Sequence, residues 1–111
     1  MIDGADEMPD AEALPQSWIP VDTRTSDSLV AELQRELSTR HVLFGHRVRA
    51  IARSGARDDV LFESLEDAPT VFVVHLTWKP ETEPDWPFTT RFHSRRQFVQ
   101  DWSREDFDTA G

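Results

Sequence analysis

The segment from Val71 to Trp78 constrains the fold of this chain more than any other. It reads Val-Phe-Val-Val-His-Leu-Thr-Trp, and it is the most apolar run in a polar sequence. Such β-branched and aromatic side chains favour a strand, along which alternate residues face opposite sides. One face would carry Phe72, Val74, Leu76 and Trp78, and the other Val71 and Val73. A strand that is apolar on both faces is typical of the covered centre of a sheet.

Composition limits both the class of protein and its partners. A chain of 111 residues has the size of one domain with one modest core. It has no cysteine, which excludes disulfides and thiolate metal sites. A net charge of −9 repels phosphates, so we do not expect a nucleic-acid partner. No run approaches the roughly 18 apolar residues of a membrane span, and the acidic N-terminus is unlike a signal peptide. We therefore expect a cytoplasmic protein that has no membrane partner and no cofactor.

The N-terminal part of the chain divides into an acidic tail and a helix. Residues 1–24 are rich in charge and poor in large apolar side chains, which predicts a disordered tail ahead of one α+β domain at 25–111. The Trp18-Ile19-Pro20-Val21 patch is expected to dock on that domain. A helix is expected over 27–38, since leucines recur there at every fourth position, with Ser26 or Asp27 as its N-cap.

The remainder predicts an antiparallel sheet and a second helix. Strands are expected at 47–53, 59–65 and 71–78, with a short fourth strand at 89–92 as an option. The turns between the first three are too short for parallel crossovers, and Gly45 can adopt a positive φ in the turn that precedes them. Ser94-Arg95-Arg96-Gln97 matches a capping box, so the second helix should start there and end near Glu105. The predicted fold is a two-layer α+β sandwich: a meander of three or four antiparallel strands, an N-terminal and a C-terminal helix, and the 79–90 loop over the second face.

Several short motifs in the middle of the chain carry a resemblance to a known family. They are His41-Val42-Leu43-Phe44-Gly45, Val48-Arg49-Ala50-Ile51-Ala52, Asp58-Asp59-Val60-Leu61-Phe62, Val73-Val74-His75-Leu76-Thr77-Trp78 and Trp86-Pro87. With these motifs, the segment from His41 to about Trp102 resembles a family of small bacterial proteins that has no established function. The chain departs from that family at Asp67-Ala68-Pro69, where a glycine turn is expected. The resemblance supports the architecture and implies no activity.

His75 is the first candidate site residue. A hairpin centred on Asp67-Ala68 would place it opposite Val60, close to Asp58 and Asp59. Two interpretations stay open: a core histidine with satisfied nitrogens, or a histidine that contacts a ligand or transfers protons, together with Arg91, His93 or a nearby carboxylate. The four histidines do not have the spacing of metal ligands, so we expect no metal site. No catalytic residue can be named.

Arginines offer a second candidate surface. Arg47, Arg49 and Arg53 would share one face of the first predicted strand and form a basic stripe that could hold a phosphate or an acidic segment. The acidic residues of the next strand offer the alternative that cross-strand ion pairs neutralise the stripe. We favour neutralisation.

The proline-rich loop after the central strand is the third candidate site. Trp78 and Trp86 flank it, and large rigid side chains on a loop can form a binding surface or can hold the loop to its own domain. We expect a non-enzymatic protein-interaction module, by analogy with the immunity proteins that neutralise toxins. The alternative is a small-ligand-binding protein or an enzyme that uses His75.

Overall fold

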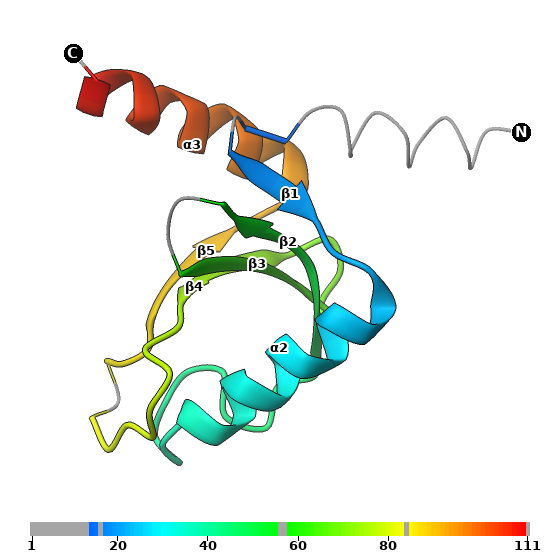
Figure 1. Cartoon of the computed structure of the whole chain (residues 1–111), viewed down its shortest axis with the longest axis vertical. Helices are drawn as coiled ribbons and strands as arrows, with labels where there is room; N and C mark the ends of the chain where they lie inside the picture. Colours follow the sequence, from blue (N-terminus) through cyan, green and yellow to red (C-terminus); the bar gives the residue numbers. More distant parts are fainter. Residues whose placement is uncertain (1–13, 16, 56–57, 84, 111) are drawn as a thin grey trace, which may run out of the picture.

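The sheet is a five-stranded antiparallel meander in which each strand pairs with the next one in the sequence. The computed structural model describes residues 14–15, 17–55, 58–83 and 85–110. In chain order the elements are β1 (Trp18–Pro20), α2 (Thr23–Glu36), β2 (Val48–Ser54), β3 (Asp59–Ser64), β4 (Val71–His75), β5 (Phe88–Phe92) and α3 (Arg95–Ala110). Figure 1 shows the curved sheet with the two helices on its two sides. The predicted α+β class is confirmed, although the sheet has five strands rather than three or four.

Each helix covers its own face of the sheet. Side chains alternate along β3 and β4, so these central strands contribute to two separate cores. The core beneath α2 contains Leu29, Leu33, Val60, Phe62, Phe72 and Val74. The core beneath α3 contains Trp18, Leu61, Val71, Val73, Phe92 and Phe98. The expected two-layer sandwich is therefore wrong, because α3, rather than the 79–90 loop, packs on the second face (Figure 1).

The Trp18 patch forms a strand of the sheet. β1 pairs with the end of β2, in the register Trp18 with Ser54 and Ile19 with Arg53. The Trp18 ring packs edge-on against Phe98, with 5.3 Å between ring centroids. The sheet thus begins ahead of residue 25, where the folded domain was expected to start. Residues 1–13, which make up most of the predicted disordered tail, lie outside the described residues.

Helix α2 begins earlier than its leucine pattern suggested. Asp22 is the N-cap, and its carboxylate accepts a hydrogen bond of 2.8 Å from the Thr25 amide. This bond lowers the pKa of Asp22. Ser26, one of the two expected caps, is instead buried one turn further on, where its hydroxyl accepts a hydrogen bond from the Ala50 amide. That bond ties the helix to β2.

A β-bulge interrupts β2 at Ile51. Ala50 pairs with Phe62, whereas Ala52 already pairs with Leu61, so one extra residue lies between them. The extra residue reverses the alternation of side chains. Residues before the bulge, such as Ala50, face the α2 core, and Ala52 after it faces the α3 core.

The ends of β4 and α3 also differ from prediction. β4 stops at His75 instead of Trp78, and α3 runs on to Ala110 rather than ending near Glu105. The Ser94 hydroxyl accepts a hydrogen bond from the Gln97 amide, which is half of the predicted capping box. The Gln97 side chain reaches back one residue further than the motif requires, to the amide of His93.

Within the described residues, no helix is long and apolar enough to cross a membrane.

Gly45 has the positive φ predicted for it, at 78°. A Cβ at this position would meet no atom within 4 Å, so only the backbone conformation disfavours a side chain there. We expect Gly45→Ala to lower the free energy of unfolding by about 1 kcal/mol in urea denaturation. Gly45→Asn is the matched control and should lose less, because asparagine tolerates this conformation. Equal losses for the two variants would contradict this explanation.

Candidate functional site

His75 forms a hydrogen-bonded pair with Asp59 on the face of the sheet that α3 covers. The two residues are direct cross-strand partners, and His75 Nδ1 lies 2.8 Å from Asp59 Oδ1. The side chain of Asp59 is 6 % exposed and that of His75 is 46 % exposed. A buried carboxylate needs a hydrogen-bond donor, and the Nδ1–H of the imidazole supplies one. The expected register, with His75 opposite Val60, was one residue out.

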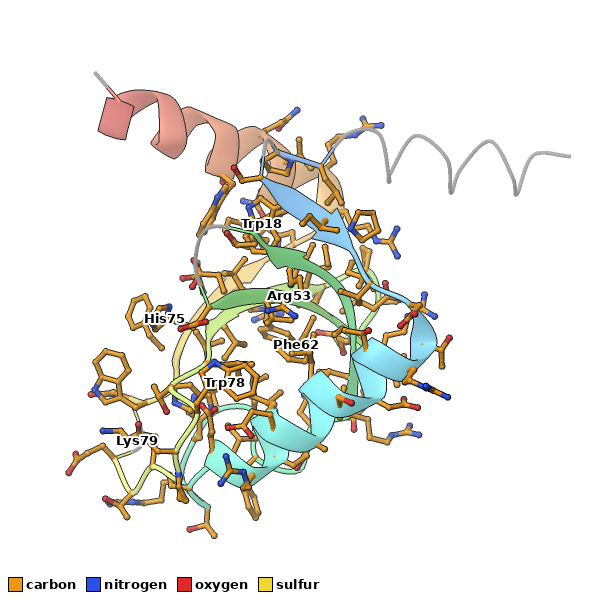
Figure 2. All side chains as sticks on the ribbon, viewed as in Figure 1. Trp18, Arg53, Phe62, His75, Trp78 and Lys79 are labelled. Atoms are coloured by element: carbon orange, nitrogen blue, oxygen red, sulfur yellow. The ribbon has the colours of Figure 1, made fainter. Side chains whose placement is uncertain are left out.

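A cavity of about 290 Å³ opens beside this pair. The sheet contributes Asp59, Val73, His75, Phe88 and Thr90, the loop before β5 contributes Trp86, and α3 contributes Trp102. His75 is in register with Phe88 on its other side, so the imidazole lies between the carboxylate and an aromatic side chain. In Figure 2, His75 lies at the margin of the sheet, and the chain runs on from it toward Trp78 and Lys79. The imidazole therefore belongs to a concave site rather than to a closed core.

A second and larger concavity, of about 590 Å³, shares two of these side chains. It is lined by Arg40, His41, Val42, Asp85, Trp86, Phe88 and Thr89. Trp86 and Phe88 thus stand between the two hollows, with 6.3 Å between their ring centroids. Together with Val42 they are exposed to 43 %, 58 % and 73 %. We refer to Val42, Trp86 and Phe88 as the apolar surface.

Hydrogen bonds of His41 hold the backbone beneath the apolar surface. Its ring is buried, and its Nε2–H donates a hydrogen bond of 2.8 Å to the carbonyl of Pro87, directly between Trp86 and Phe88. Its Nδ1 accepts from the Leu43 amide at 3.0 Å. Both ring nitrogens are therefore used inside the protein, and His41 holds the segment after α2 against the start of β5.

Glu36 anchors the proline-rich loop at its other end. Its fully buried carboxylate accepts hydrogen bonds from the amides of Thr77 and Trp78, at 2.9 and 2.7 Å, and from the Thr77 hydroxyl. Its backbone carbonyl accepts from the amide of Glu81. Burial and a hydrogen bond with Glu32 raise the pKa of Glu36 to about 7. The loop is thus held to the last turn of α2.

Trp78 was predicted as a binding residue, and its backbone is the unusual feature. Its φ is 62°, in the left-handed region that side chains other than asparagine rarely adopt. The hydrogen bond from its amide to Glu36 holds this conformation. The indole is half exposed but lines neither of the two hollows that Trp86 shares. The two tryptophans, named together from the sequence, are therefore not joined in one site.

Arg91 and His93 do not converge on His75. Arg91 pairs in register with Phe72, so it lies on the opposite face of the sheet from His75, and it contacts Asp67 at 3.5 Å. His93 follows the end of β5, whereas His75 pairs with its first residue. Of the alternatives offered for His75, the structure brings a nearby carboxylate, Asp59, to it and not Arg91 or His93.

The basic stripe is divided by the bulge in β2. Arg49 pairs with Glu63 and lies on the α3 face, while Arg53 pairs with Val60 and lies on the α2 face. Arg47 precedes the strand and contacts Glu66 at 3.5 Å. Arg49 itself makes a 3.0 Å ion pair with Glu63, which also binds Arg95 of α3 at 2.6 Å. The one-faced stripe predicted from the alternation is therefore wrong.

Sequence reasoning did not single out most of the residues that line the hollows, among them the large apolar residues Val42, Phe88 and Trp102. Val42 lies in the turn before the first predicted strand, Phe88 within the predicted 79–90 loop, and Trp102 within the predicted second helix. The sequence alone gives little indication that such residues line a site, because an apolar residue in a loop or helix is more often part of the hydrophobic core. Among the described residues, no group of three or more histidine and acidic side chains is arranged to hold a metal ion.

Comparison with known proteins adds no relative. The chain matches no family model, no curated protein and no solved structure. The resemblance of the segment from His41 to Trp102 to a small bacterial family stays a prediction.

Proposed function

We propose that this protein is a non-enzymatic protein-interaction module that binds an extended segment of a partner along β5. The observation that supports the proposal most directly is the exposure of Val42, Trp86 and Phe88 around one concavity. Large apolar side chains that cluster in the open commonly mark interaction sites, and aromatic residues are prominent among those that carry binding energy.

Hydrogen bonds hold the chain at Pro87, within the apolar surface, and at Thr77 and Trp78, which favours binding. His41 holds Pro87 from below, and Glu36 fixes Thr77 and Trp78 at the other end of the same loop. Side chains on a segment that is already ordered lose less conformational entropy when a partner binds. Attachment of the loop to its own domain is therefore compatible with a role in binding a partner.

The edge of the sheet beside this surface is available for strand addition. β5 is the last strand in the order, and no described strand pairs with its outer edge. It is regular over Phe88–Phe92, with no proline and no register shift. The opposite edge, β1, has three residues and ends at Pro20, a combination that blunts an edge. An extended partner segment can hydrogen-bond to β5 while its side chains meet Trp86 and Phe88.

The charge of the chain indicates the kind of partner. A net charge of −9 attracts basic proteins and repels acidic ones. A basic partner, such as a toxin neutralised by an immunity-type protein, fits that charge. Association should accordingly slow as ionic strength rises.

Capture experiments with paired variants test this proposal. The double variant Trp86→Ala/Phe88→Ala should bind a stoichiometric partner about 30-fold more weakly than the native chain does, because two contact residues are truncated. Ile19→Ala/Leu65→Ala is the matched control, since both residues are exposed apolar side chains that line neither hollow. It should retain the partner. Equal capture by all three proteins, or the absence of a stoichiometric partner at every salt concentration, would overturn the proposal.

One observation supports a second candidate function. The pairing of His75 with a buried carboxylate, beside an aromatic-lined cavity, is the arrangement expected of a small-ligand site or of a general base in an enzyme. Partner binding at β5 and ligand binding beside His75 share Trp86 and Phe88, whereas His75, Thr90 and Trp102 line the cavity beside His75 and not the larger concavity. Substitutions at Thr90 therefore test ligand binding separately.

A further inference from the structure

The cavity beside His75 combines three aromatic side chains with one directed hydrogen-bonding group. Trp86, Phe88 and Trp102 supply flat apolar surface, and they come from the loop, from β5 and from α3. Such surfaces favour a planar ring, which can stack or pack edge-on against them. With a volume of about 290 Å³, the cavity is at the lower end of the range for small-molecule sites. The ligand therefore has one ring or two fused rings.

The hydrogen bond between His75 and Asp59 indicates which hydrogen-bonding group the ligand should carry. Because Asp59 accepts from Nδ1–H, the neutral imidazole presents its second nitrogen, Nε2, as an acceptor. No group in the described part of the chain hydrogen-bonds to Nε2. A ligand that carries an O–H or N–H can donate a hydrogen bond to Nε2, and the Thr90 hydroxyl in the same lining can bind a second polar group.

Charge excludes one class of aromatic ligand. Within the described lining, Asp59 is the acidic residue, and neither arginine nor lysine is present. A carboxylate or phosphate on the ligand would approach that acid in a chain whose net charge is −9, and both charges repel an anion. We propose that the cavity between His75 and Trp102 binds a neutral planar aromatic compound that donates an O–H or N–H to His75 Nε2.

This proposal does not require partner binding at β5, although both sites include Trp86 and Phe88. Three simple probes test it. Indole, 1-methylindole and benzoate share a flat aromatic body, but only indole donates an N–H and only benzoate is anionic. Titration of the full chain is followed by NMR through the side-chain N–H signals of Trp86 and Trp102. Indole should give saturable shifts and bind about ten-fold tighter than 1-methylindole, which is the factor for one hydrogen bond of ordinary strength. Benzoate should give no saturable shift.

A variant that fills the cavity localises the binding. Thr90→Leu places a larger apolar side chain in the lining and should weaken indole binding about ten-fold or more. Thr23→Leu, an exposed threonine at the start of α2, is the matched control and should bind indole as the native chain does. The proposal is overturned if indole and 1-methylindole bind equally, if neither binds, or if Thr90→Leu leaves the affinity for indole unchanged. Those results would leave the test of the apolar surface unaffected.

Discussion

Replacing Phe98 with alanine should lower the free energy of unfolding by about 3–5 kcal/mol, as measured by urea denaturation. Phe98 is fully buried, and its ring lies 5.3 Å from that of Trp18, 5.5 Å from that of Phe92 and 5.7 Å from that of Trp102. Its removal leaves a cavity where α3, β1 and β5 meet, and few side chains are placed to fill it. The near-ultraviolet circular dichroism signal of Trp18 and Trp102, which pack against Phe98, should weaken at the same time.

The control for this substitution is Phe44→Ala, which removes the same ring from an exposed position. It should change the free energy of unfolding by no more than about 0.5 kcal/mol. A loss below about 1 kcal/mol for Phe98→Ala would mean that α3 contributes little to the stability of the second core.

Raising the pH from 5 to 8 should destabilise the protein, by at most about 3 kcal/mol, through Glu36. The pKa of this carboxyl is raised to about 7 in the folded chain by burial and by its hydrogen bond with Glu32, from a reference of 4.5. The folded state therefore holds a proton that the unfolded chain has already released. The stabilisation is complete below about pH 4.5 and is lost as the pH rises through 7. Urea denaturation at several pH values measures this loss.

Glu36→Gln separates this effect from the titration of other groups. The amide has the shape of the protonated carboxyl and does not ionise, so the variant should lose much of the decline in stability between pH 5 and 8. Glu81→Gln should keep the native decline, since Glu81 bonds to Glu36 through its backbone amide, which the substitution leaves in place. A decline of the same size in Glu36→Gln and the native protein would refute the assignment. Below pH 4.5 the opposite trend should appear, because hydrogen bonds lower the pKa of Asp22, Glu32 and Glu66.

Local sequence patterns predicted the parts of the fold that depend on neighbours in the chain. The apolar run that starts at Val71 identified an interior strand, although β3 rather than β4 lies at the centre of the five-stranded sheet. The Ser94 hydroxyl caps α3, and Gly45 takes the positive φ that its turn requires. Each of these features is decided within a few residues. The helix boundaries were less accurate, because Asp22 competes with Ser26 as a cap and tertiary packing recruits the latter.

Features that depend on distant residues were missed. The bulge at Ile51 places Ala50 in the core beneath α2 and Ala52 in the core beneath α3, and no local sequence pattern marks the extra residue. Glu36 reads as an ordinary polar position on a helix, yet its partners lie about 40 residues further along the chain. By contrast, Asp59 was one of the two carboxylates expected near His75, although the register of the hairpin was misplaced by one residue.

The order of the strands has a consequence for how the chain folds. Each strand pairs with the one before it, so most contacts join segments that are close in sequence, and chain-closure entropy is small at each step. A sheet of this kind can grow strand by strand as it leaves the ribosome, without waiting for a distant segment. β5 is then the last strand to be added, and its outer edge is the one with which no strand in the described part of the chain pairs.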